Sequence, residues 1–394
     1  MATFARGSDG ELDDRVRLTL GDKDVLVAES YDVTRSYLVQ PSDFRLRLGS
    51  GDTLPDLIKL AAPKTRFELR IGDVLQQTGE VDGYEAENSV GASELTVHGR
   101  DAMARVFDTY MRADQTFNDA TYESLVYNVL TKELKLGDIV LDSDNEANRR
   151  VTTGTPVRSK KVPNTRGRAI KPDGGGSSVV RSVHAKLGER AYDFLRRHLD
   201  RAGIFLSSTA DGNFVLSAPN GAQPPIARIV RKRGGSSVER SHVISARLRV
   251  DTTHRFSRVD VYLRGRGKKA GRPQSKGIYV DAEMEHSGFD RPLVIRDVNC
   301  TTDEQAEYLA RRKIAEGCRN GFRLEYVMSG HSTPSLVGGG RAVWAIDTVV
   351  QVDDDELGLH ENFWVEAVSF HRPPTTTTLR LMRLKDLVFG TDDE

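Results

Sequence analysis

The chain has 394 residues, which is too long for one hydrophobic core and predicts at least three domains. Its 57 basic and 57 acidic side chains cancel, which argues against a general nucleic-acid binder, while 38% hydrophobic and 29% charged residues argue against a disordered or membrane-embedded protein. No apolar stretch approaches the roughly 20 residues of a membrane helix, and residues 1–14 lack a secretion signal. We therefore expect a flexible N-terminal tail on a protein made and kept in the cytoplasm.

Residues 15–100 are predicted to form β-structure throughout. The segments 16–20 and 44–48 alternate apolar and polar residues with period two, so Arg45 and Arg47 should face water while their apolar neighbours face a core. This pattern is typical of a small antiparallel barrel or sandwich, and we assign 15–105 to a first β-barrel domain.

Residues 106–242 are predicted to form an α+β domain. Helical spacing begins near residue 119, and a second helix is expected at 189–202 with Gly203 at its C′ position. A turn signal at 210–213 between two apolar runs predicts a β-hairpin after this helix. The basic and glycine-rich segment 155–178 is predicted to be a mobile loop between the helices.

Residues 243–390 are predicted to form a second β-barrel domain, followed by a short tail at 391–394. After a strand at 259–263, the basic segment 264–276 resembles a long hairpin tip. A capping box of Thr302 and Gln305 predicts a helix over 302–319, after which strands resume. The fold class is therefore mainly β with α+β, consisting of two similar antiparallel β-barrel domains and an inserted α+β region.

The two β-regions carry the same short pattern, near residues 66–101 and again near 348–386. In both copies an alternating strand breaks at an acidic turn, and a second strand follows in which Val81 aligns with Val365. Counting on without a gap sets Leu95 against Leu379. The closing segments then align Arg100-Asp101 with Lys385-Asp386. A duplicated module favours ring building over catalysis, because two similar domains per subunit let an oligomer show twice its own symmetry.

The sequence contains no recognisable catalytic, cofactor-binding or metal-binding set, so we predict none. The glycine-rich segments 174–176 and 338–340 lack the context of a phosphate loop. His98, His331 and His371 are expected to be partly exposed strand or turn residues rather than metal ligands.

Two further features are interpreted as structural. The acidic run 353–356 lacks the ligand spacing of a calcium loop and is predicted to be a solvated hairpin turn. Cys300 and Cys318 have no ligand-type partners nearby and are expected to be buried structural thiols.

The basic segments 155–176 and 264–276 are the strongest functional candidates. Their cations could meet phosphate, an acidic partner or a membrane surface. No aromatic residue is interleaved with them, so stacked bases would have no platform. Solvated loops, a partner contact and specific nucleic-acid recognition all stay open.

The succession of elements resembles a known family. The β-module, the helix 189–202, the turn Asp211-Gly212-Asn213 and the closing β-module occur in the order found in baseplate hub proteins of contractile-tailed bacteriophages. The similarity is to Mu-like phages in particular, whose hubs are also called late control D proteins, and to the hub portion of type VI secretion spike proteins. It covers roughly residues 15–390 and includes the short patterns 79–84 and 99–101, but the basic loops have no match.

The resemblance implies a structural virion protein without enzyme activity or cofactor. Such hubs are homotrimers whose two β-barrel domains form a pseudo-sixfold ring between the sixfold tail tube and the threefold central spike. The expected partners are the tail tube protein, the central spike protein, other baseplate proteins, and DNA that passes through the channel without specific binding. The expected location is the tail baseplate, assembled in the host cytoplasm, and residues facing the channel should be acidic or neutral.

Two alternatives remain at this point. One is a tail-associated cell-wall hydrolase, although no pair of carboxylates or Cys–His set stands out in the sequence. The other is a module that binds nucleic acid or another polyanion through the basic loops, which predicts binding that weakens steeply with salt.

Overall fold

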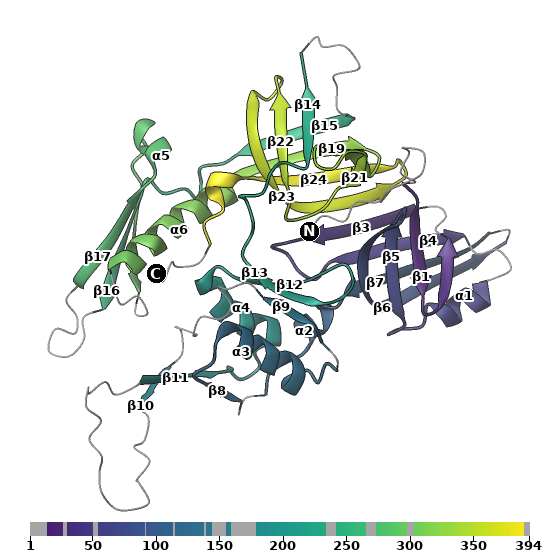
Figure 1. Cartoon of the computed structure of the whole chain (residues 1–394), viewed down its shortest axis with the longest axis horizontal. Helices are drawn as coiled ribbons and strands as arrows, with labels where there is room; N and C mark the ends of the chain where they lie inside the picture. Colours follow the sequence, from purple (N-terminus) through teal and green to yellow (C-terminus); the bar gives the residue numbers. More distant parts are fainter. Residues whose placement is uncertain are drawn as a thin grey trace, which may run out of the picture.

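One sheet of 13 strands runs through both predicted β-regions and makes the protein mainly β (Figure 1). The computed structural model describes residues 14–26, 30–49, 54–90, 92–112, 115–137, 139–143, 155–158, 179–233, 242–264, 273–297 and 303–389.

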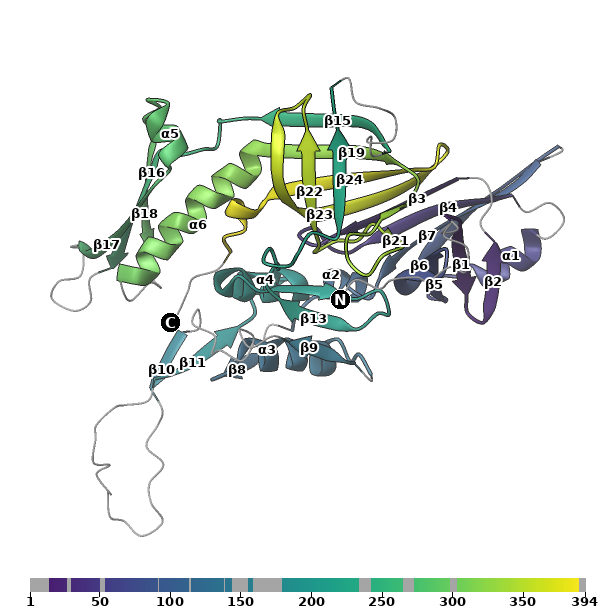
Figure 2. The same ribbon diagram turned by 45° about the horizontal axis from the view of Figure 1, so that its top comes forward.

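The first region contributes seven strands and one short helix. They are β1 (Val16–Leu20), β2 (Lys23–Leu26), β3 (Ser30–Ser36), β4 (Asp43–Gly49), α1 (Leu54–Leu60), β5 (Arg66–Ile71), β6 (Val74–Ser89) and β7 (Ala92–Asp101). The predicted alternation on β4 is confirmed, because Phe44 and Leu46 are buried while Arg45 and Arg47 are exposed. The paired ends of β6 and β7 project from the body of the sheet (Figure 2).

The second region contributes the other six strands. They are β14 (Ala227–Arg231), β15 (Val243–Val250), β19 (Phe322–Ser329), β22 (Val349–Asp354), β23 (Leu359–Arg372) and β24 (Thr376–Arg383), and the small hairpin of β20 (Ser332–Pro334) and β21 (Arg341–Val343) lies beside them. The prediction of two closed barrels is corrected here. None of the described sheets closes, because β23 pairs with β3 and the two regions continue as one open sheet.

An α+β unit with its own core follows β7 in the chain. Its elements are α2 (Ala104–Asp108), β8 (Thr116–Asn118), α3 (Tyr122–Asn128) with a π-helical turn (Val129–Glu133), β9 (Leu141–Ser143), β10 (Thr155–Arg158), β11 (Val179–His184), α4 (Ala191–Ala202), β12 (Phe205–Ser208) and β13 (Phe214–Ser217). Gly203 ends α4 in the left-handed conformation at φ 70°, and β12 and β13 form the predicted hairpin. Thr155 to Arg158 are a strand rather than loop, and the rest of the basic loop lies outside the described residues.

A third unit is inserted between β15 and β19. It lies at the left of Figure 1, where α6 crosses a small sheet. It contains β16 (Arg258–Arg264), β17 (Pro273–Val280), α5 (Ala282–His286), β18 (Pro292–Asp297) and α6 (Asp303–Gly321). The apolar face of α6, with Ala306, Leu309 and Ile314, packs on Val259 and Val261 of β16. The predicted basic hairpin 264–276 exists as β16 and β17, but 273–276 belong to a strand and 265–272 lie outside the described residues. Thr302 of the predicted capping box lies outside them as well.

Glycine at position 99 is required by close packing inside the first region. A Cβ added there would lie 2.7 Å from the Glu80 carbonyl oxygen and 2.9 Å from Cε1 of the buried Phe44 ring. We expect Gly99→Ala to lower the free energy of unfolding by about 1–3 kcal/mol, since both neighbours are held in the core. Gly137→Ala is the matched control, because its Cβ would meet nothing within 4 Å. Chemical denaturation of the two variants measures the difference, and equal stabilities would contradict this account of the packing.

Candidate functional site

The two regions have the same order of six strands, and we call them the first and the second copy. The strand order β3-β4-β7-β6-β5-β1 in the first copy corresponds to β15-β19-β24-β23-β22-β14 in the second. The repeated order extends over more strands than the three found in the sequence. One difference is that β14 runs parallel to β22, whereas β1 runs antiparallel to β5.

Irregular backbone features recur at equivalent positions and fix the alignment of the copies. The pairing of β6 with β7 shifts between Val81 and Gly83, and that of β23 with β24 shifts between Val365 and Ala367. Lys64 N–H donates to the Val81 carbonyl at 2.8 Å, and Asp347 N–H donates to the Val365 carbonyl at 3.0 Å.

The two donors also share an unusual conformation. Lys64 has φ 71° and Asp347 has φ 54°, a region that non-glycine residues seldom occupy. Each of them lies two residues before its short strand begins. A shared bulge and a shared strained residue argue for a repeated structure rather than two unrelated small sheets.

The ungapped alignment of the third strand is wrong by two residues. Gly83 pairs with His98 and Ala367 pairs with Arg380, so the second hairpin is two residues shorter. Leu95 therefore corresponds to Thr377 rather than to Leu379. The alternation hid the error, because a shift of two residues keeps each side chain on the same face. By the same correspondence Asp101 matches Arg383, three residues before the Asp386 with which the sequence pattern aligned it.

The junction between the copies is an antiparallel pairing of β23 with β3, from Ala367 opposite Ser36 to Arg372 opposite Tyr31. On the outer face Asp32 pairs with His371, and next to it the Thr34 and Ser369 hydroxyls hydrogen-bond at 3.3 Å. Those two strand faces are polar.

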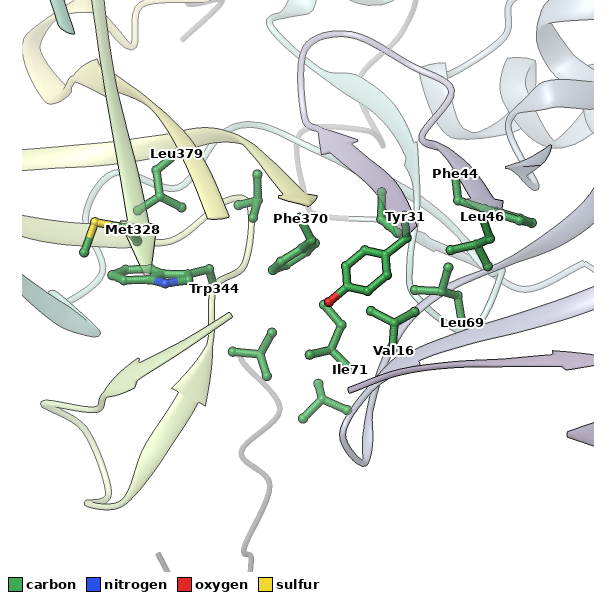
Figure 3. Close-up of a cluster of buried hydrophobic side chains, with 14 of the residues drawn as sticks. Val16, Tyr31, Phe44, Leu46, Leu69, Ile71, Met328, Trp344, Phe370 and Leu379 are labelled. Carbon is green, nitrogen blue, oxygen red and sulfur yellow. The ribbon is translucent and has the colours of Figure 1, made fainter. Parts of the chain in front are cut away.

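The inner face of the junction belongs to a hydrophobic core shared by both copies. Val33 and Phe370 lie opposite each other on the paired strands and are fully buried. Tyr31 lies between Phe370 of the second copy and Ile71 of the first (Figure 3). Apolar burial and backbone pairing together hold the copies in one relative position.

His331 is buried at this junction, contrary to the prediction that it is partly exposed. Its ring hydrogen-bonds to the Tyr31 hydroxyl through Nε2 at 2.7 Å and to Thr377 Oγ1 through Nδ1 at 2.9 Å. Because the Thr377 hydroxyl donates to the Gly330 carbonyl, its oxygen accepts from Nδ1–H, and Nε2 then accepts from Tyr31. Burial lowers the pKa of His331 to about 4 and raises that of Tyr31 to about 12, so both are neutral. His371 is partly exposed and His98 is exposed in its strand, so neither is buried like His331.

The acidic run 353–356 is only in part the predicted solvated turn. Asp354 is fully buried and accepts a hydrogen bond from the Tyr326 hydroxyl at 2.8 Å, so it ties β22 to β19. Asp353, Asp355 and His360 approach one another closely enough to hold a metal ion. Lys232 Nζ already lies 2.7 Å from Asp353 and 3.3 Å from Asp355, and its hydrogen bond is the main cause that lowers the pKa of Asp353.

These contacts favour an ion-pair network over a metal site, because a metal ion would have to displace the lysine. The network joins the end of β14 to β22 and β23. It thus holds the edge of the second copy in place.

A cleft of about 840 Å³ separates the first copy from the α+β unit. Asp82 and Asp108 line it and both pair with Arg100, whose guanidinium lies 2.6 Å from Asp82 and 2.7 Å from Asp108, and Arg105 pairs with Glu80. The hydrogen bond from Arg100 lowers the pKa of Asp108. The two arginines thus offset part of the negative charge of the three carboxylates.

Asp101 is a buried carboxyl at this cleft, and its burial raises its pKa. Its oxygens accept from Ser208 Oγ at 2.8 Å, Ser42 N–H at 3.1 Å and Met103 N–H at 3.0 Å. These bonds link β7 of the first copy to β12 of the α+β unit. Arg100 and Asp101, two residues of the short pattern 99–101, thus connect domains.

Of the other residues that the sequence singled out, namely the two cysteines and the basic segments, the structure describes only some. Cys318 is a buried free thiol, as predicted, and burial raises its pKa to about 11, while Cys300 lies outside the described residues. Most of both basic segments lies outside them too, and their role stays a prediction. Within the described ranges, no helix is both long and apolar enough to cross a membrane.

No protein-family model matches this sequence, and no curated protein matches it. Among solved structures, the 43 kDa tail protein of prophage MuSo2 from Shewanella oneidensis superposes with a TM-score of 0.71 at 20% identity, covering 95% of this chain and 99% of its own. The tail protein from Neisseria meningitidis MC58 gives a TM-score of 0.71 at 20% identity, with 95% and 98% covered. The chain has the fold of phage tail proteins.

A more distant structure agrees with this assignment of the fold. Prophage tail protein gp18 from Listeria monocytogenes EGD-e superposes with a TM-score of 0.54 at 10% identity, covering 93% of this chain and 94% of its own. The likeness to Mu-like tail proteins expected from the order of elements is therefore confirmed. It extends over both copies and the units inserted between them.

The neutral state of His331 makes the stability of the junction depend on pH. Between about pH 4 and 6.5 the unfolded state binds a proton at this residue and the folded state does not, so the free energy of unfolding falls as the pH falls through that window. We expect wild type to lose up to about 1.4 kcal/mol per pH unit more than His331→Gln there. Denaturant unfolding at several pH values measures both slopes, and His198, also held neutral by burial, contributes equally to each. Identical slopes would contradict the account.

Proposed function

We propose that this chain is the structural baseplate hub of a contractile phage tail or of a related injection system. It acts as a homotrimer whose six module copies form a ring of pseudo-sixfold symmetry. The observation that carries the proposal is the junction of β23 with β3, which joins two copies of one module within a single chain.

Two similar modules in each of three subunits present six similar faces, which fit a sixfold tail tube on one side, while the trimer itself fits a threefold spike on the other. The fold shared with two prophage tail proteins over 95% of the chain supports placing this ring in a tail. The proposed partners are the tail tube protein, the central spike protein and other baseplate proteins.

The domains take separate roles in this proposal. Residues 15–105, together with β14 and the sheet strands within 243–390, build the ring, and the rest of 106–242 lies at its periphery or toward the spike. The protein resides in the tail baseplate of the virion after assembly in the host cytoplasm, and DNA passes through the channel without specific binding. Its action is mechanical rather than enzymatic, and the Arg100 guanidinium binds Asp82 and Asp108 at the cleft beside the α+β unit.

The proposal predicts the mass of the purified chain in solution. A chain of 43.7 kDa should form a particle of three times that mass, about 131 kDa, as measured by light scattering at micromolar concentration. A monomer whose mass does not change when the spike protein is added would contradict the proposal.

A further inference from the structure

The in-chain junction has an unoccupied counterpart. The junction joins the second half of β23 to the edge of β3 that faces away from β4. The equivalent edges in the two copies are the second half of β6 and the edge of β15 that faces away from β19. Among the described strands, β6 beyond Val81 pairs with β7 alone, and β15 pairs with β19 alone. Each chain therefore carries two edges that pair with no other described strand. They are equivalent to the edges of β23 and β3 that pair within the chain.

The duplication also sets the register that these edges would adopt. Arg45 lies opposite His98 and Asp32, and Glu325 lies opposite Arg380 and Arg247. Since His98 corresponds to Arg380, Arg247 of β15 corresponds to Asp32 of β3. In the same way, β6 corresponds to β23 with Gly83 at the position of Ala367.

We propose that residues 84–88 of β6 pair antiparallel with residues 246–250 of β15 from a second copy of the chain, in the register of β23 and β3. This inference rests on the proposed function, because it supplies the contact by which subunits close into a ring. The transferred register sets Tyr84 opposite Val250, Glu85 opposite Arg249, Ala86 opposite Leu248, Glu87 opposite Arg247 and Asn88 opposite Ala246.

The outer face of this pairing is complementary in charge. Glu85 and Glu87 of β6 would lie directly opposite Arg249 and Arg247 of β15, and all four are exposed in the single chain. Opposite charges in such cross-strand pairs stabilise a sheet, and like charges destabilise it. The pair Glu87–Arg247 falls at the position where His371 and Asp32 pair inside the chain.

The same charges oppose the wrong pairings. Two β6 edges would bring glutamates together, and two β15 edges would bring arginines together. The favoured contact is therefore between different edges, which generates a ring when the rotation closes.

The inner face of the pairing would cover exposed apolar groups. Tyr84 is 38% exposed and Val250 is 62% exposed, so the pairing would remove apolar surface of both side chains from water. Leu248, opposite Ala86, already packs partly on the shared core. At the equivalent in-chain position Val33 and Phe370 are fully buried, so pairing would extend the core from one subunit to the next.

Cysteine cross-linking tests the register directly. Glu85→Cys mixed with Arg249→Cys, and Glu87→Cys mixed with Arg247→Cys, should form disulfide-linked dimers under mild oxidation, because directly opposite Cβ atoms lie about 5 Å apart. Glu85→Cys mixed with Arg247→Cys is the matched control, since that diagonal separation of about 7–8 Å is too long for a disulfide. Wild type shows the background from the two native cysteines.

Charge reversal tests the same contact without cysteine chemistry. The double variant Glu85→Arg, Glu87→Arg should raise the dissociation constant between subunits at least about tenfold. Adding Arg247→Glu and Arg249→Glu to the same chain should return the dissociation constant to the wild-type value. The control is a reversal of two exposed charges away from both edges, Asp56→Arg with Asp73→Arg.

The outcomes separate this inference from the proposed function. Cross-links at the two opposite pairs only, with loss and recovery of assembly on charge exchange, support it. A stable trimer that gives neither result overturns the pairing of β6 with β15 and leaves the hub proposal standing. A wild-type chain that stays monomeric in the presence of the spike protein, together with cysteine variants that give no cross-links, overturns both.

Discussion

The pairing of β23 with β3 is the constraint on which the rest of the structure depends. A slip of one residue in this register would turn Phe370 and Val33 from the shared core to the solvent, so the register and the core specify each other. Tyr31, His331 and Thr377 form a connected set of hydrogen bonds there, and a satisfied buried network favours one arrangement of the copies. The relative position of the two modules is thereby a built-in property of each chain.

The other parts attach to this double module without interrupting it. Between β3 and β4 the chain crosses in a short connection, whereas the equivalent β15 and β19 are separated by the unit of β16, β17, β18 and α6. The α+β unit is attached through Asp101, whose hydrogen bonds span from β7 to β12. The repeated strands keep their order because these additions extend outward from loops, where inserted chain disturbs few contacts. A chain of this fold can therefore vary in these added units while its junction is preserved.

Local features of this fold could be predicted from the sequence, and features that depend on distant contacts could not. The alternation on β4, the end of α4 at Gly203 and the hairpin of β12 and β13 follow from neighbouring residues. The sequence did not show that β15 is equivalent to β3, because an inserted unit separates β15 from β19. The prediction of two closed barrels was wrong, because the closure of a sheet depends on which strand edges pair. His331 was predicted to be partly exposed, and its burial could not be foreseen because its partner Tyr31 lies 300 residues away. At the proposed contact between β6 and β15, the charges of Glu87 and Arg247 are visible in the sequence. Only the strand register of the structure shows that they would lie opposite each other.

The rotational symmetry of the assembled particle tests the central claim, that each chain carries two equivalent ring modules, most directly. Electron-microscope projection images taken along the particle axis should show a central channel, an overall threefold symmetry and six nearly evenly spaced densities around the rim. The even spacing is expected because the junction between subunits repeats the junction of β23 with β3. A particle with three widely separated densities, or one without a channel, would contradict the account.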